Sequence, residues 1–230
     1  MIKEAVILAG GLGTRLRSVV DDLPKSMAPL NGRPFLHYIL REIGSSGVER
    51  IILATGYKSD IIRKYFGSSF GNISLVYSEE SEPLGTGGAI KHACTHISGE
   101  NFFVINGDTL YKVSLEDMEK SFISWGTPVT VALKPMNSFD RYGNVSLQGT
   151  LISAFSEKQF CSKGLINGGV YIINRKWLGE NAVDKKFSFE KDVLEKNAGR
   201  GNLSGFISDS YFIDIGIPED YSRASLELND

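Results

Sequence analysis

Apolar residues recur along the first half of the chain in two alternating patterns. Continuous apolar runs of strand length occupy residues 2–9, 49–54, 73–77 and 102–105. Apolar positions at helical spacing occupy residues 34–44, 59–66, 88–97 and 114–125. Strands that are apolar on both faces and alternate with helices indicate a mostly parallel sheet covered by helices on both sides. The predicted fold class is therefore α/β.

The pattern changes after residue 125. Further β-like segments follow with little helical sequence between them, at residues 129–134, 143–147, 151–156 and 169–173. Helical spacing returns at residues 190–196 and 218–228, around β-like segments at 203–207 and 211–213. We expect these later strands and loops to wall a pocket. No repeat, low-complexity stretch or linker divides the chain, so one domain over residues 1–230 is expected.

Size and charge narrow the function classes. The chain has 230 residues, 25 Lys and Arg against 27 Asp and Glu, and a formal net charge of -2. This balance gives no electrostatic reason to expect a nucleic-acid or membrane partner. No apolar run approaches the roughly 18 to 20 residues that cross a bilayer, and no signal peptide is recognisable. Cys94 and Cys161 lack metal-ligand spacing, so we expect reduced thiols in a cytoplasmic protein.

A glycine-rich segment, Leu8-Ala9-Gly10-Gly11-Leu12-Gly13-Thr14-Arg15-Leu16, follows the first predicted strand. Glycines let backbone N–H groups approach an anion closely, which is typical of a phosphate-binding loop. A purely structural turn explains a bare Gly-Gly-x-Gly equally well. Arg15 and Lys25 favour the phosphate interpretation, because a guanidinium and an ammonium beyond the loop match a triphosphate.

Two common phosphate motifs do not fit this segment. The chain has no Walker pattern, and Leu16 stands where the dinucleotide fingerprint requires its third glycine. Ala54-Thr55-Gly56 stands where that fingerprint expects an acid after the second strand. A dinucleotide-dependent dehydrogenase is therefore not expected.

The segment, continued by Leu23-Pro24-Lys25-Ser26-Met27-Ala28-Pro29-Leu30, resembles the signature of the sugar-1-phosphate nucleotidyltransferases. The resemblance extends over Glu82-Pro83-Leu84-Gly85-Thr86-Gly87-Gly88, Asn106-Gly107-Asp108, Tyr142-Gly143-Asn144, Glu157-Lys158, Asn167-Gly168-Gly169-Val170-Tyr171 and Asp214-Ile215-Gly216. It implies a Rossmann-like nucleotidyltransferase fold that joins a nucleoside triphosphate to a sugar 1-phosphate and releases pyrophosphate. Many relatives add a C-terminal left-handed β-helix, and none is expected here.

The implied reaction needs positioning and charge neutralisation rather than a general base, because the attacking phosphate oxygen is already ionised. The resemblance assigns Mg²⁺ to Asp108 and Asp214, whose oxygens are ligands that this ion prefers. Arg15, Lys25 and Lys158 complete the implied catalytic set. The alternatives are an Asn-Gly-Asp turn for Asp108 and a helix N-cap for Asp214.

The resemblance also supplies the acceptor side of the site. It implies that Lys158 holds the sugar phosphate and that Glu157 accepts hydrogen bonds from sugar hydroxyls. The other implied sugar contacts are Tyr142, Gly143, Asn167, Gly168 and Gly169. Taken alone, Glu157-Lys158 fits a solvated surface pair, and the other residues fit packing at strand ends.

Two further groups of residues suggest no chemistry of their own. His37, His92 and His96 have no carboxylate at ligand spacing, so zinc is not expected. Residues 187–192 are interpreted as an ordinary capped helix start.

Glu80 bears on the choice of base. The resemblance places it where thymidylyl and uridylyl relatives carry a glutamine, with Gly85 and Thr86 as further nucleotide contacts. A carboxylate only accepts hydrogen bonds, which suits the two adjacent donors of guanine. Glu79 is the candidate if the loop is one residue out of register. GTP is therefore favoured over UTP and dTTP, while ATP and CTP, whose bases each offer one amino donor, stay open as alternatives.

The overall pattern resembles the bacterial D-glycero-α-D-manno-heptose 1-phosphate guanylyltransferases most. A uridylyl- or thymidylyltransferase, a mannose-1-phosphate guanylyltransferase and a non-catalytic nucleotide-binding regulatory module are the alternatives. Assembly into a homo-oligomer is compatible with the sequence.

Overall fold

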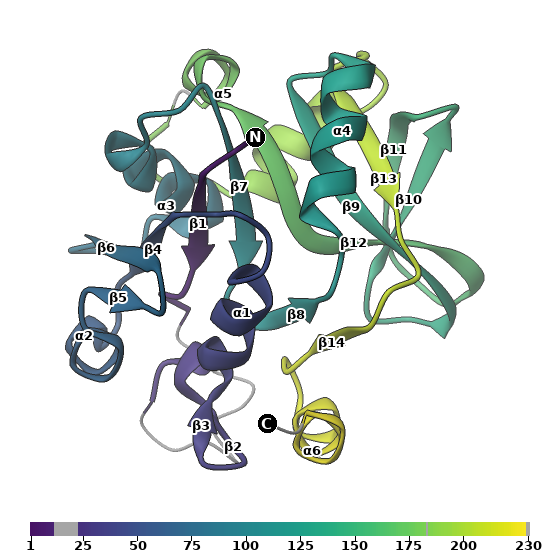
Figure 1. Cartoon of the computed structure of the whole chain (residues 1–230). Coiled ribbons are helices and arrows are strands. Elements are labelled where there is room, and N and C mark those ends of the chain that lie inside the picture. The colour runs from purple at the N-terminus through teal and green to yellow at the C-terminus, as the bar shows by residue number, and fades with distance from the viewer. Residues whose placement is uncertain (12–22, 183, 229–230) are drawn as a thin grey trace.

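A mixed β-sheet forms the centre of the computed structural model, which describes residues 1–11, 23–182 and 184–228 (Figure 1). Its strands are β1 (Glu4–Leu8), β4 (Arg50–Thr55), β5 (Ser69–Phe70), β6 (Ile73–Glu79), β7 (Asn101–Asn106), β9 (Val129–Phe139), β10 (Gly143–Gln148), β11 (Leu151–Lys158), β12 (Cys161–Asn174) and β13 (Leu203–Ile207). They are arranged in the order β10-β11-β13-β9-β12-β7-β1-β4-β6-β5. Two small sheets pair β2 (Pro29–Leu30) with β3 (Arg33–Pro34), and β8 (Thr109–Tyr111) with β14 (Phe212–Asp214).

The parallel part of the sheet comprises β7, β1, β4 and β6. It lies where continuous apolar runs predicted buried strands. Ala5 and Ile7 of β1 pack into one hydrophobic cluster, whereas Val6 packs into the other. This alternation follows from the two-residue period of a strand and explains why both faces of the sheet need helices.

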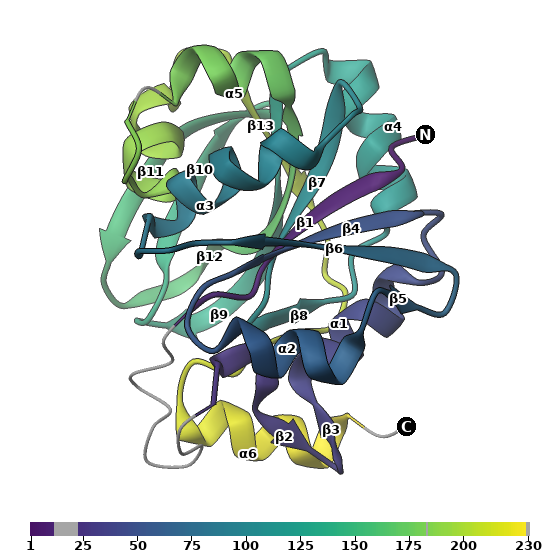
Figure 2. The same ribbon diagram turned by 90° about the vertical axis from the view of Figure 1, so that its left-hand side faces the viewer.

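Helices cover both faces of the sheet (Figure 2). One face packs against α1 (Phe35–Ile43), α2 (Ser59–Phe66) and α4 (Leu115–Trp125). The other packs against α3 (Gly85–Ala93), α5 (Arg175–Asn181) and the π-helix η4 (Phe189–Glu195). The C-terminal helix α6 (Pro218–Glu227) lies beside the β2–β3 hairpin in both views. Two single 3₁₀ turns, η2 (Lys25–Met27) and η3 (Cys94–His96), complete the described helices.

The structure confirms most predicted elements, and three of them differ from their predicted limits by three or more residues. β9 and β12 continue well past the predicted segments, and β12 passes through Gly169, whose φ of +72° interrupts its register with β9. α3 begins at Gly85, three residues earlier than predicted. A Cβ on Gly88 would lie 2.5 Å from the carbonyl oxygen of Lys185, so the start of α3 packs directly on the chain before η4. The glycines therefore allow close packing of α3. Because glycine has a low helix propensity, the sequence did not indicate the first residues of this helix.

No helix in the described part of the chain combines the length and the apolar character needed to cross a bilayer.

Candidate active site

A cavity of about 560 Å³ lies at the carboxyl edge of the parallel strands. This is where open α/β sheets bind their ligands. Its lining includes nine of the predicted nucleotide contacts: Leu8, Ala9, Gly10, Gly11, Lys25, Glu80, Gly85, Thr86 and Asp108. The other predicted contacts, Gly13, Thr14 and Arg15, fall outside the described residues. We call this cavity the donor cavity.

Two glycines allow the strand ends to meet at the floor of the donor cavity. A Cβ on Gly10 would lie 3.1 Å from the backbone nitrogen of Gly56, and one on Gly107 would lie 2.5 Å from the carbonyl oxygen of Leu8. In contrast, a Cβ on Gly11 would meet no atom of the described residues within 4 Å. Close packing therefore accounts for Gly10, whereas no contact with the described part of the chain requires a glycine at residue 11.

Lys25 lies between the two predicted metal ligands. Its Nζ is 2.5 Å from Oδ2 of Asp108 and 3.6 Å from Oδ1 of Asp214. The aspartates are close because β8 pairs with β14, and the Ile215 N–H donates to the Asp108 carbonyl oxygen at 3.0 Å. Burial and the Asp108 charge raise the pKa of Asp214, while Lys25 partly opposes that shift. The two aspartates therefore form an anionic site that the Lys25 ammonium partly neutralises.

A second cavity of about 690 Å³ adjoins the donor cavity. Thr86, Asn106 and Asp108 line both cavities, so the two share a wall. Four predicted sugar contacts also line the second cavity: Tyr142, Lys158, Asn167 and Gly169. Asp214 and Gly216 line it as well. We call it the acceptor cavity.

Three predicted sugar contacts are absent from the described lining of the acceptor cavity. Glu157 is exposed near the end of β11. A Cβ on Gly143 would lie 2.5 Å from the Ser156 carbonyl oxygen, and one on Gly168 would lie 2.4 Å from the Tyr111 ring. Strand packing therefore explains these two glycines.

Several lining residues of the acceptor cavity were given no role from the sequence, among them Asn106, Arg141, Tyr171 and Glu190. Asn106 and Tyr171 lie within motifs that carry the family resemblance, and Arg141 directly precedes another, so these motifs were the available signal. Tyr171 is a strand residue whose hydroxyl accepts a hydrogen bond from Asn167 Nδ2 at 3.0 Å. Glu190 lies in the segment interpreted as a capped helix start. The structure confirms that cap, since Ser188 Oγ accepts from the Lys191 N–H at 3.2 Å.

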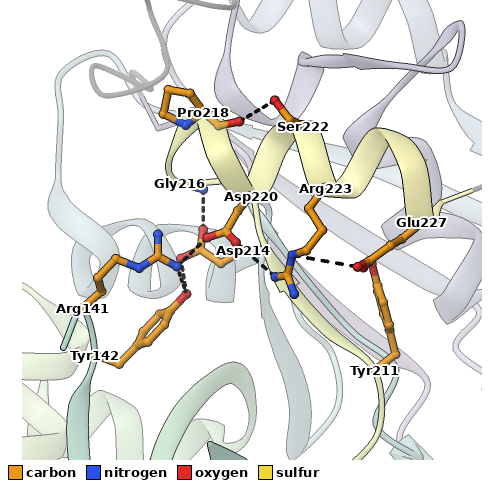
Figure 3. A network of polar contacts seen from close by, with 10 residues as sticks. All are labelled: Arg141, Tyr142, Tyr211, Asp214, Gly216, Pro218, Asp220, Ser222, Arg223 and Glu227. Carbon is orange, nitrogen blue, oxygen red and sulfur yellow. Dashed lines mark hydrogen bonds and ion pairs between the residues drawn. The ribbon is translucent and has the colours of Figure 1, made fainter. Parts of the chain in front are cut away.

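Hydrogen bonds fix the orientation of Asp214 (Figure 3). Its Oδ1 accepts from the Gly216 N–H at 2.7 Å, and its Oδ2 accepts from the Tyr142 hydroxyl at 3.3 Å. Burial and the nearby Asp214 charge raise the pKa of Tyr142, so its hydroxyl stays protonated and can donate. Tyr142 thus both lines the acceptor cavity and orients an aspartate.

A chain of ion pairs connects this cavity to α6 (Figure 3). Arg141 Nη2 donates to Asp220 Oδ2 at 2.5 Å, and Arg223 Nη2 donates to Asp220 Oδ1 at 3.1 Å. Arg223 Nε also lies 4.0 Å from Glu227 Oε1. The carboxylate of Asp220 therefore joins the Arg141 guanidinium at the cavity wall to the C-terminal helix.

Glu80 is half-buried at the donor cavity. Its Oε2 accepts a hydrogen bond from the Leu84 N–H at 3.0 Å, just before α3 begins. Burial raises the pKa of this carboxyl, while that hydrogen bond partly lowers it. Oε2 of Glu80 thus stabilises the loop between β6 and α3. The neighbouring Glu79 is exposed and is not part of the described lining.

Comparison with known proteins agrees with this geometry. A family model described as nucleotidyl transferase matches residues 4–230. The chain belongs to the nucleotidyl transferase family. This nucleotidyl transferase is 52% identical, over 98% of both chains, to D-glycero-α-D-manno-heptose 1-phosphate guanylyltransferase of Aneurinibacillus thermoaerophilus. It is 44% identical to the enzyme of the same name from Campylobacter jejuni, over 95% of this chain and 96% of that one.

Solved structures show the same fold. HddC from Yersinia pseudotuberculosis, crystallised in complex with GMP-PN, matches with a TM-score of 0.89 and 39% identity over 99% of this chain and 100% of that one. UTP-bound UGPase from Acinetobacter baumannii matches with a TM-score of 0.81 at 22% identity, over 98% of this chain and 93% of that one. The Rossmann-like nucleotidyltransferase fold implied by the sequence is therefore confirmed.

Proposed function

We propose that this enzyme transfers GMP from GTP to D-glycero-α-D-manno-heptose 1-phosphate and releases pyrophosphate, forming a GDP-heptose. The observation that carries this proposal is the 52% identity, over nearly the full length of both chains, to a protein named for that activity. The two adjoining cavities support it, because the reaction brings two phosphorylated substrates together. Such nucleotide sugars feed the synthesis of surface polysaccharides.

The proposed chemistry takes place where the two cavities meet. An oxygen of the sugar phosphate attacks the α-phosphorus of GTP, and the bond from that phosphorus to the oxygen bridging the β-phosphorus breaks. No base is required, because the attacking oxygen carries no proton at neutral pH. Lys25 neutralises charge beside Asp108, while Arg141 and Lys158 offer the acceptor phosphate two cations. Positioning and charge neutralisation supply the catalysis.

Enzymes of this family generally use a divalent metal ion, and we propose Mg²⁺ bound by Asp108 and Asp214. The residues fit this ion, because two carboxylates lie close enough to share the Lys25 ammonium and provide hard oxygen ligands. When bound, Mg²⁺ would neutralise phosphate charge during the transfer. Asp214 is kept in place by Gly216 and Tyr142.

For the base, we propose that Glu80 recognises guanine. Its Oε1 is not used in the hydrogen bond with Leu84, and Glu80 lines the donor cavity. We place the reaction in the cytoplasm, where nucleoside triphosphates are made; the free thiols of Cys94 and Cys161 are consistent with that compartment.

Pyrophosphate release from the purified enzyme tests the proposed function. GTP, ATP, CTP, UTP and dTTP are each combined with a panel containing heptose, mannose, glucose and N-acetylmuramic acid 1-phosphates. We expect the highest kcat/KM with GTP and the heptose. Preference for a pyrimidine triphosphate would contradict the guanylyl assignment, and preference for mannose would contradict the acceptor assignment. Absence of turnover with every pair would favour a regulatory binding module.

A further inference from the structure

Glu190 places a carboxylate in the wall of the acceptor cavity. Its Oε2 accepts hydrogen bonds from Thr86 Oγ1 at 2.6 Å and from Ser188 Oγ at 2.9 Å. Thr86 Oγ1 is itself fixed, since it accepts from the Phe189 N–H at 2.9 Å. The carboxylate is therefore held from behind in a defined orientation.

The hydrogen bonds to Thr86 and Ser188 involve only Oε2 of Glu190, not Oε1. Within the described residues, Glu190 Oε1 takes part in none of these hydrogen bonds, and no Lys, Arg or His lies within ion-pair distance of Glu190. A half-buried carboxylate is costly unless donors solvate it. An ionised carboxylate accepts several hydrogen bonds and donates none. A ligand that meets Glu190 from the cavity must therefore present hydrogen-bond donors.

The charges of the acceptor cavity decide which end of the substrate meets Glu190. Arg141 and Lys158 come from the β9–β10 loop and the end of β11, whereas Glu190 comes from η4 beside α3. The sugar phosphate is attracted to the two cations and repelled by a carboxylate that has no cation of its own. Glu190 therefore faces the part of the substrate that carries hydroxyl groups.

Asn106 gives independent support to this orientation. It lines the same cavity, and its buried Oδ1 has no hydrogen-bond partner among the described residues. It is a second acceptor that lacks a donor, and it lies beside Gly169, since a Cβ on that glycine would be 2.7 Å from Asn106 Nδ2. A buried acceptor without a partner costs free energy unless a ligand or water supplies a donor. An amide acceptor and a carboxylate acceptor in the lining of one cavity suit a polyhydroxylated ligand.

We propose that Glu190 is a specificity-determining residue of the acceptor site, whose Oε1 accepts a hydrogen bond from a hydroxyl of the sugar 1-phosphate. This inference deepens the proposed function and rests on it. The π-helical backbone of residues 189–195 agrees with such a role, because π-helical turns are frequent at functional sites.

Steady-state kinetics of Glu190→Gln test the proposal. The acceptor is the sugar 1-phosphate that the wild-type enzyme uses fastest in the panel above, so Glu190 is tested whichever sugar that is. Glutamine keeps an oxygen for Thr86 but replaces the free acceptor with an amide donor. We expect the KM for the sugar phosphate to rise about tenfold or more, with the KM for GTP within about twofold of wild type.

Two control variants separate recognition from a structural role. Glu195→Gln changes an exposed carboxylate of the same π-helix and should leave both KM values unchanged. Ser188→Ala removes one anchor of Glu190 and the cap of η4 but keeps the carboxylate. It should lower Tm with a smaller effect on the KM for the sugar phosphate than Glu190→Gln has. The proposal is overturned if Glu190→Gln leaves that KM unchanged, raises both KM values equally, or only reproduces the effects of Ser188→Ala.

Discussion

At the residue scale, Lys25 compensates two carboxylates that would otherwise repel each other. Its side chain is only 12% exposed, so solvent screens these contacts weakly. The ammonium and the aspartates come from separate parts of the chain and meet where the two cavities join. This junction is where we propose that the phosphate groups react, so removal of a charge there should impair the reaction.

Asp108→Asn should lower kcat on the order of a hundredfold or more, because it removes a charge that stabilises the transition state. Asp209→Asn is a suitable control, since Asp209 is 84% exposed and pairs with Lys134 away from the described cavity linings. Activity should also disappear in excess chelator and return with added Mg²⁺. Unchanged turnover in Asp108→Asn, or full activity with chelator, would refute the metal assignment.

Glu80→Gln should change base preference rather than folding. The glutamine oxygen can still accept from the Leu84 N–H, but its amide group would face the donors of guanine. We expect a loss of about tenfold to a hundredfold in kcat/KM for GTP. Efficiency with UTP or dTTP should stay equal or rise, because their O4 atoms accept from an amide.

The quantity to measure is the ratio of GTP to UTP efficiency. Glu79→Gln is the matched control and should leave this ratio unchanged, since Glu79 is exposed. A ratio that stays constant in Glu80→Gln and changes in Glu79→Gln would transfer base recognition to the neighbouring residue.

The sequence alone identifies some of the residues at this site better than others. Lys25, Asp108 and Asp214 are recognisable because each lies in a distinctive motif. Arg141 and Glu190 depend on tertiary contacts, with Asp220 and Thr86 respectively, and no local spacing reveals those contacts. Glu80 was predicted only in part: the sequence indicates a nucleotide contact, but its hydrogen bond with the Leu84 N–H is visible only in the folded loop.

At the scale of elements, α6 influences a site that it does not itself fill. Asp220, in its first turn, holds Arg141 at the wall of the acceptor cavity and is only 14% exposed. Its position near the helix N-terminus also suits a negative charge. The C-terminal helix therefore holds in place the cation that we propose for the acceptor phosphate.

Asp220→Asn should raise the KM for the sugar phosphate about threefold to tenfold with little change in kcat, because it weakens the contact that positions Arg141. Glu219→Gln, an exposed substitution in the same helical turn, should have no effect. A loss confined to kcat, or equal effects of the two substitutions, would argue against a positioning role.

Element boundaries were predictable where the pattern is strong and failed where glycine is used for packing. α2 was predicted with its observed limits, because its apolar period is clear. The start of α3 was predicted three residues late, because Gly85 and Gly87 resemble a loop in the sequence, and only the fold shows that Phe187 packs against them. The first half of β12 was missed for a related reason, since Gly168 and Gly169 resemble a strand boundary.

At the scale of the whole molecule, Lys25 and Lys158 line different cavities, which predicts different roles for the two lysines. Lys158→Ala should raise the KM for the sugar phosphate about tenfold with little effect on the KM for GTP, because Lys158 lines only the acceptor cavity. Lys25→Ala should chiefly impair use of GTP. Varying one substrate at a time distinguishes the two effects, and equal losses toward both substrates in both variants would show that the cavities are not separate sites.

Strand β12 runs from the wall of the acceptor cavity to the centre of the sheet as one strand with an irregularity at Gly169. Val170 to Asn174 pair with β7 in the centre of the sheet, whereas Asn167 lies in the wall of the acceptor cavity. β9 pairs with β12 on either side of the irregularity at Gly169. A strand bonded along its edges resists bending within the sheet, so the acceptor wall and the parallel strands form one stiff frame. We therefore expect the acceptor wall and the parallel strands to move together, and amide exchange in residues 170–173 should remain equally slow with and without substrates.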